Sequence, residues 1–175
     1  MELGDLPLIA EDLGVITPEV GDLRDALSLP GMKILQFAFD GNPKNSYLPH
    51  NIENHNCVMY TGTHDNDTTN GWYYCQDMTD DRKRIIRRYI RCTDDEAFHT
   101  KMIIYAYSTI SRLVILPMQD VLGYGREFRM NIPGTSSGNW LWKIRADCPY
   151  SEHASSLKEL VVIYNRLPIE EDGNS

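Results

Sequence analysis

Four short apolar runs recur along the chain and predict the strands of a buried sheet. They lie at residues 6–10, 32–39, 57–61 and 113–117. Each run is close to continuously apolar rather than alternating, which is typical of strands that are covered on both faces. Because helical patterns alternate with the runs, the sequence predicts βαβ units, a parallel sheet and an α/β fold.

Polar capping residues followed by apolar residues three or four positions apart predict the helices. The expected helix starts are Thr17-Pro18-Glu19, Thr79-Asp80-Asp81 and Asp94-Asp95-Glu96. The first helix should use Val20, Leu23, Leu27 and Leu29 as its apolar face and be ended by Pro30-Gly31. A last helix is expected over about residues 151–167.

Polar clusters stand where the predicted strands end. In chain order they are Glu11, Asp40, His64-Asp65-Asn66-Asp67 and Gln119-Asp120. Parallel strands joined by crossovers of one hand have their C-terminal ends on one face of the sheet, so these clusters should gather there. This is the layout of a TIM-barrel active site, but a complete barrel needs eight strands and about 250 residues. The sequence therefore predicts half of such a barrel.

Composition indicates which classes of partner and which cellular compartment to expect. The 25 acidic and 17 basic residues give a formal charge of −8, which argues against a nucleic-acid partner. Four widely spaced cysteines without a CxxC pair indicate reduced thiols in a cytoplasmic protein. No apolar run approaches the ~18 residues of a membrane span, so no membrane partner is expected. We expect one domain over residues 1–168 and a frayed tail at 169–175.

Several blocks of the sequence resemble one known family between about residues 4 and 145. The blocks are Ile9-Ala10-Glu11-Asp12-Leu13-Gly14, Gln36-Phe37-Ala38-Phe39, Tyr60-Thr61-Gly62-Thr63-His64-Asp65-Asn66-Asp67, Gln119-Asp120-Val121-Leu122-Gly123 and Arg129-Met130-Asn131. They look like the C-terminal half of 4-alpha-glucanotransferase, also called amylomaltase or disproportionating enzyme, in glycoside hydrolase family 77. The resemblance implies a TIM barrel, of which this chain would supply roughly strands five to eight and a C-terminal helix.

The resemblance also implies an activity and site residues. Members of this family transfer α-1,4-glucan segments to the 4-hydroxyl of an acceptor glucan with retained configuration, and need no cofactor or metal. By position in the motifs, Glu11 resembles the general acid/base and Asp65 the carboxylate that stabilises the transition state. His64 resembles the sugar-binding histidine, and Phe37 and Asn131 are expected to contact the glucan. The expected partners are maltooligosaccharides, glycogen or starch.

The family's third carboxylate, its nucleophilic aspartate, stands in an Asp-His-Phe stretch that this sequence does not contain. A retaining transfer needs a protonated carboxyl that expels the leaving oxygen and a carboxylate that traps the sugar, about 5 to 5.5 Å apart. Glu11 suits the acid role because burial beside an apolar strand and nearby anions would favour its protonated form. Without the nucleophile, the chain alone is expected to be inactive.

Other interpretations of these residues remain open at this point. His64, Asp65 and Asp67 with His50 or His55 could bind a metal in a metal-dependent hydrolase, although their spacing matches no tight chelating motif. The aromatic residues near the proposed cleft could stack on sugars or simply pack: Phe37, Trp72, Tyr73, Trp140 and Trp142. A half barrel also exposes strand edges, so a non-catalytic glucan-binding module that pairs with another copy or with the missing N-terminal half is the alternative.

Overall fold

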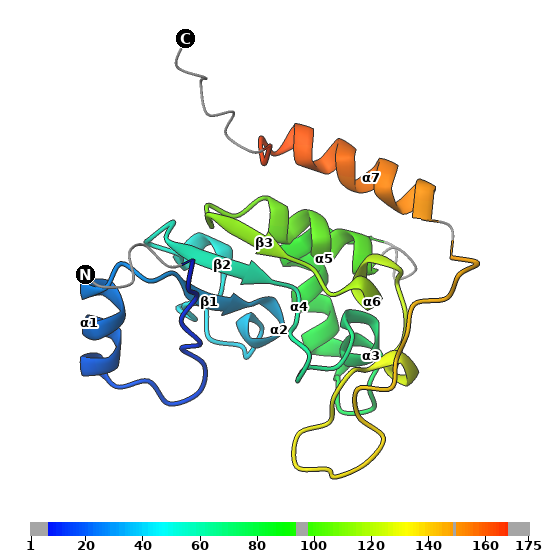
Figure 1. Cartoon of the computed structure of the whole chain (residues 1–175), viewed down its shortest axis with the longest axis horizontal. Coiled ribbons are helices and arrows are strands. Elements are labelled where there is room, and N and C mark those ends of the chain that lie inside the picture. Colours follow the sequence, from blue (N-terminus) through cyan, green and yellow to red (C-terminus); the bar gives the residue numbers. More distant parts are fainter. Residues whose placement is uncertain (1–6, 94–97, 149, 168–175) are drawn as a thin grey trace. The chain divides into compact units, whose positions relative to one another are not determined.

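The computed structural model describes residues 7–93, 98–148 and 150–167, and its described part contains a three-stranded parallel sheet. The strands are β1 (Gly31–Ile34), β2 (Cys57–Tyr60) and β3 (Leu113–Ile115), in the order β1-β2-β3 (Figure 1). The parallel α/β arrangement that the apolar runs predict is confirmed for these three strands.

The strand predicted over residues 6–10 is wrong for the described positions 7–10. This segment donates one hydrogen bond to the chain just before β1, from Ala10 N to Pro30 O at 2.9 Å. A strand needs a repeated ladder of such bonds, and a single one does not make it. Leu8 and Ile9 are accordingly 54% and 40% exposed.

The second predicted strand ends early, because β1 stops at Ile34 and the chain turns into the short helix α2 (Leu35–Ala38). An apolar run of this length fits a buried helical turn as well as a strand. The turn buries Leu35 and Ala38 and leaves Phe37 42% exposed. The change of element therefore directs Phe37 away from the core.

The predicted helix starts are confirmed where the structure describes them. The helices of the first part of the chain are α1 (Pro18–Ala26), α3 (Thr69–Tyr73), α4 (Asp80–Ile90), α5 (Phe98–Tyr107) and α6 (Met118–Val121), with 3-10 turns at Pro49–Asn51 and Arg126–Phe128. Thr79 caps α4 by accepting a hydrogen bond from Arg82 N at 3.3 Å. The predicted cap of α5 at residues 94–96 lies outside the described residues.

The apolar face predicted for α1 is not buried. Val20, Leu23 and Leu27 are 47%, 61% and 55% exposed, and α1 contains no buried residue. The helix also ends at Ala26, ahead of the predicted stop at Pro30-Gly31. The spacing of apolar residues thus predicted the helix, although the part of the chain that the structure describes does not cover this face.

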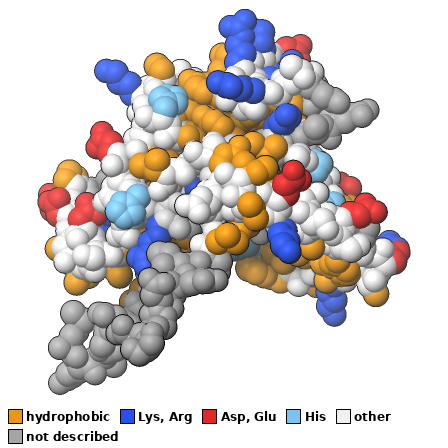
Figure 2. All heavy atoms as spheres, turned by 90° about the horizontal axis from the view of Figure 1, so that it is seen from above, with side chains coloured by type: hydrophobic (Ala, Val, Ile, Leu, Met, Phe, Trp, Pro, Cys, Tyr) orange, Lys and Arg blue, Asp and Glu red, His pale blue; other side chains and the backbone are white. Residues whose placement is uncertain are grey.

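The core lies between the sheet and the helices α3, α4 and α5. Its members include Leu35, Phe39, Met59, Tyr73, Ile86, Phe98 and Met102. The rings of Tyr73 and Phe98 stack with their centroids 3.6 Å apart. Strand β2 is largely buried, whereas Leu113 and Ile115 of β3 are 45% and 37% exposed. Hydrophobic side chains also form patches among charged ones on the surface shown in Figure 2.

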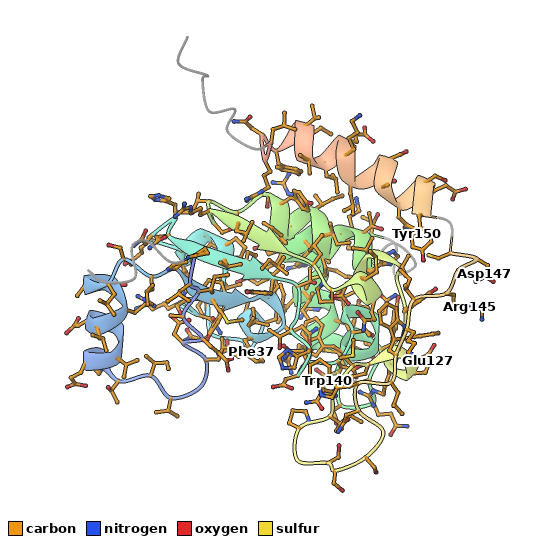
Figure 3. The ribbon with its side chains drawn as sticks, in the orientation of Figure 1. Phe37, Glu127, Trp140, Arg145, Asp147 and Tyr150 are labelled. Atoms are coloured by element: carbon orange, nitrogen blue, oxygen red, sulfur yellow. The ribbon has the colours of Figure 1, made fainter. Side chains whose placement is uncertain are left out.

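The chain separates into two compact units, Met1–Trp142 and Lys143–Ser175. The second contains α7 (Tyr150–Ile163), which starts one residue before the predicted helix and ends short of residue 167. At its start, the Tyr150 hydroxyl donates to the Arg145 carbonyl at 2.9 Å, and Arg145 pairs with Asp147 (Figure 3). The predicted tail at 169–175 lies outside the described residues.

Candidate functional site

A cavity of about 1040 Å³ lies at the C-terminal ends of the three strands. Its walls come from the segment at 11–14, from Phe37 after β1, from residues 60–68 after β2 and from residues 115–120 after β3. The loop at 129–140 adds further wall residues. The polar clusters that follow the strands in sequence therefore do meet at one face of the sheet.

The loop after β2 presents His64 and Asp65 to the cavity through a tight turn. Asn66 Oδ1 accepts hydrogen bonds from both the backbone N and the hydroxyl of Thr63, each at 2.9 Å. These bonds close the turn over its two middle residues. The side chains of His64 and Asp65 stay 53% and 52% exposed, so a ligand in the cavity can reach them.

Asp65 is held by the loop that follows β3. Its Oδ1 accepts a hydrogen bond from Asn131 Nδ2 at 2.6 Å and lies 3.4 Å from His64 Nε2. Arg129 reinforces this contact, because its Nη2 donates to the Asp65 carbonyl at 2.6 Å and its Nε to the Asn131 carbonyl at 2.7 Å. Asn131 thus holds the carboxylate of Asp65, and Arg129 holds its backbone carbonyl, from 66 and 64 positions further along the chain.

Asp120, in α6, lies at the cavity wall and joins α6 to the loop after β2. Its side chain is buried and accepts hydrogen bonds from the Thr61 hydroxyl at 2.5 Å and from Thr69 N at 2.7 Å. Burial raises the pKa of the Asp120 carboxyl, and the bonds from the two threonines act in the opposite direction. Since these partners begin and end the loop that contains Asp65, Asp120 positions that loop.

Asp67 anchors the far end of the same loop. Its carboxylate accepts a bond from Arg126 Nε at 2.7 Å, and its carbonyl accepts one from Gln36 Nε2 at 2.8 Å. A Cβ on Gly71 would meet this carboxylate and lie 2.9 Å from the Arg126 Cα. Only glycine allows the close approach of these segments.

Glu11 lines the cavity but is exposed, so the burial expected for it from the sequence is not found. Its neighbour Asp12 holds the segment against β1. Asp12 Oδ1 accepts a hydrogen bond from Met32 N at 2.7 Å, and its Oδ2 pairs with Arg24. Glu11 therefore projects from an anchored backbone into open space.

The structure brings together Glu11, Phe37, His64 and Asp65 on one cavity, and Asn131 reaches it through Asp65. Arg129 was missed as a functional residue, although the Arg129-Met130-Asn131 block contains it. Among the aromatic alternatives, Tyr73 is buried and Trp72 packs against the core, whereas Phe37 and Trp140, labelled in Figure 3, line the cavity.

Neither a metal site nor a membrane span is found in the described part of the chain. Among the described residues, no three His, Cys, Asp or Glu side chains converge as metal ligands. In the same residues, no helix has the length and apolar character to cross a membrane. The cavity is lined by carboxylate, amide, imidazole and aromatic groups, a mixture that is typical of small-molecule sites.

The chain is similar to enzymes of one kind along nearly its whole length. It is 47% identical to the 4-alpha-glucanotransferase of Synechocystis sp. and 45% identical to that of Thermus thermophilus, in each case over 94% of this chain. It covers 32% and 34% of those relatives, so it spans about a third of their length.

A solved structure shares this fold. The amylomaltase of Streptococcus agalactiae, determined in complex with acarbose, superimposes on 94% of this chain and 33% of its own with a TM-score of 0.87 and 38% identity. The profile described as 4-alpha-glucanotransferase, glycoside hydrolase family 77, matches residues 1–148. Because this match extends over most of the sequence, the chain belongs to the 4-alpha-glucanotransferase family.

Proposed function

We propose that residues 1–168 form the C-terminal half of a 4-alpha-glucanotransferase barrel, with β1, β2 and β3 as its strands six to eight and the extended segment at residues 7–10 in the place of strand five. The proposed reaction cleaves an α-1,4 bond in a maltooligosaccharide, glycogen or starch chain and passes the segment to the 4-hydroxyl of an acceptor, with retention. One observation carries this proposal: Glu11 and Asp65, 54 positions apart, line the same cavity. Its volume of about 1040 Å³ suits a ligand of several sugar rings.

Glu11 would act as the general acid/base. It gives its proton to the leaving glycosidic oxygen, and later takes one from the attacking 4-hydroxyl of the acceptor. Its exposure in the empty cavity leaves it accessible to that oxygen, and a bound glucan would then cover it. Asp65 would accept hydrogen bonds from sugar hydroxyls and favour the positive, oxocarbenium-like transition state.

The remaining groups would bind the glucan. His64 lies next to Asp65 and offers a ring nitrogen to sugar hydroxyls. Asn131 fixes the orientation of the Asp65 carboxylate, because its Nδ2 donates a hydrogen bond to Asp65 Oδ1. Phe37 offers an exposed apolar ring from α2, the helix that follows β1. An exposed aromatic face beside hydrogen-bonding groups fits a ligand that has both C–H faces and hydroxyl edges.

The covalent step needs a nucleophilic carboxylate, and the sequence contains no Asp-His-Phe stretch to supply one. We therefore expect these 175 residues alone not to disproportionate maltotriose into glucose and longer maltodextrins. Sustained turnover by the purified chain would show that another of its carboxylates acts as the nucleophile.

A hybrid enzyme tests the proposed roles directly. This chain would replace the matching third of the Synechocystis 4-alpha-glucanotransferase, which supplies the rest of the protein. The hybrid should convert maltotriose, and the variants Glu11→Gln and Asp65→Asn should each lower kcat by a factor of about 100 or more. A hybrid that stays fully active with Glu11→Gln would refute the assignment of the acid/base.

Association through uncovered surfaces is the second candidate function. Its support is the exposure of Leu23 and Leu27 on α1 and of Leu113 and Ile115 on β3, a strand that pairs only with β2 among the described residues. Such surfaces favour pairing with another chain or another copy. Sedimentation velocity should detect species heavier than a monomer, and Leu23→Glu should reduce them; a monomer at all concentrations would exclude self-association.

A further inference from the structure

Trp140 presents a large apolar side chain to solvent at the wall of the cavity (Figure 3). The residue is 61% exposed. Its ring lies beside the imidazole of His64, with the centroids 5.0 Å apart and the planes inclined by 40°. It therefore stands next to the pair of residues proposed to hold the sugar at the reacting bond.

The backbone of Trp140 is strained, with φ at +60° in the left-handed region. Bulky residues rarely adopt this conformation, and where it persists the surrounding structure must enforce it. Trp140 N donates to the Met130 carbonyl at 2.8 Å, and Asn139 Oδ1 accepts from Ile132 N at 2.9 Å. These bonds close the loop on itself and fix the direction of the indole.

Packing does not account for this arrangement. Trp72 shows the contrast, because its ring contacts Phe39 and Phe98 and it packs against the core. Trp140 has no comparable cover from the residues that the structure describes, yet its backbone holds an unfavourable conformation. An exposed aromatic ring fixed at a cavity wall is a preformed contact surface for a ligand.

We infer that Trp140 is the platform on which one glucosyl ring of the bound glucan lies, beside His64 and Asp65. The inference rests on the proposed function and deepens it by assigning a binding position. The C–H face of a glucose ring carries weak positive charge and the indole face negative charge, so the two attract as they exclude water. The indole would thus select a glucan long enough to reach it.

Binding of maltoheptaose to the purified chain tests this inference by calorimetry. Trp140→Ala should weaken the affinity at least about tenfold, which corresponds to about 1.4 kcal/mol, and Trp140→Phe should recover part of the loss. The matched control is Leu141→Ala, because Leu141 is 73% exposed in the same loop and does not line the cavity. It should bind like the wild type.

Trp140→Gly separates binding from a structural role. Glycine adopts a positive φ without strain, so this variant should keep the melting temperature of the wild type or exceed it, while its affinity falls as in Trp140→Ala. Wild-type affinity in Trp140→Ala and Trp140→Gly would overturn the inference and leave the proposed function standing. If none of the chains, the wild type included, binds maltoheptaose, the inference is overturned, and turnover by the hybrid enzyme decides the proposed function separately.

Discussion

Replacement of Asp120 should disturb the loop that carries Asp65, because Asp120 holds both ends of that loop. In Asp120→Ala, the Thr61 hydroxyl and the Thr69 N–H lose their acceptor, and both residues are fully buried. Each buried group left without a partner costs about 1–3 kcal/mol, so the free energy of unfolding should fall by about 2–6 kcal/mol.

Asp120→Asn is the matched control. Its amide oxygen can still accept from Thr69 N, and its NH₂ can donate to the Thr61 hydroxyl oxygen. This variant should therefore lose about 1 kcal/mol or less. The difference in unfolding free energy between the two variants therefore measures the hydrogen bonds, separately from the volume that the side chain fills.

The pH dependence of stability provides an independent check. Because burial raises the pKa of Asp120, the folded chain keeps a proton that the unfolded chain has already released near its ordinary pKa of about 3.9. Between that value and the raised folded pKa, stability must fall as the pH rises. Asparagine does not titrate, so the wild type should gain stability relative to Asp120→Asn as the pH is lowered through this window.

Urea unfolding followed by circular dichroism measures both effects, at pH 7 and at a series of lower pH values. The reasoning would be refuted by an Asp120→Ala variant as stable as Asp120→Asn. A wild type that loses stability relative to Asp120→Asn on acidification through the window would show that Asp120 is not a carboxyl of raised pKa.

Three further outcomes are expected. Asn131→Ala removes the 2.6 Å bond to Asp65 and should weaken maltoheptaose binding severalfold in calorimetry while it changes the melting temperature little, since both groups are exposed; unchanged affinity would contradict the role of this bond. Gly71→Ala places a methyl group 2.9 Å from a neighbouring backbone and should cost about 1–3 kcal/mol in urea unfolding, whereas Gly21→Ala, in α1 with open space around it, should stabilise by about 0.5–1 kcal/mol; equal effects would refute the packing argument. Burial raises the pKa of Tyr105 to about 12, so ultraviolet titration should find a phenol that ionises well above 10, and stability should fall as the pH rises from 10 towards 12.

The sheet and the position of the site could be predicted from sequence because both depend on local pattern. Continuous apolar runs predict β1, β2 and β3, and the polar residues after them identify the cavity wall around Asp65. The run at 6–10 carries the same pattern, but whether such a segment becomes a strand depends on its hydrogen-bonding neighbour. The apolar pattern of the segment contains no information about which strand lies beside it.

The contacts that complete the site depend on distant positions. The bonds of Arg129 and Asn131 to Asp65 join residues more than 60 positions apart, and no periodicity predicts them. Asp120 was predicted, from its place after a strand, to lie with the other polar clusters, but its two threonine partners emerge only from the fold. The positive φ of Trp140 likewise could not be predicted from the sequence, because glycine is the residue expected at such a position.

All the hydrogen bonds that the described residues make to the side chains of Asp65 and Asp120 come from within residues 61–131. These two carboxylates are therefore held in place by the protein's own side chains and backbone. Under the proposed function, a glucan that arrives there meets groups already in place, so little of its binding energy is lost to ordering the protein. Its association should then be a single fast step, without the slow phase that a rearranging site would add.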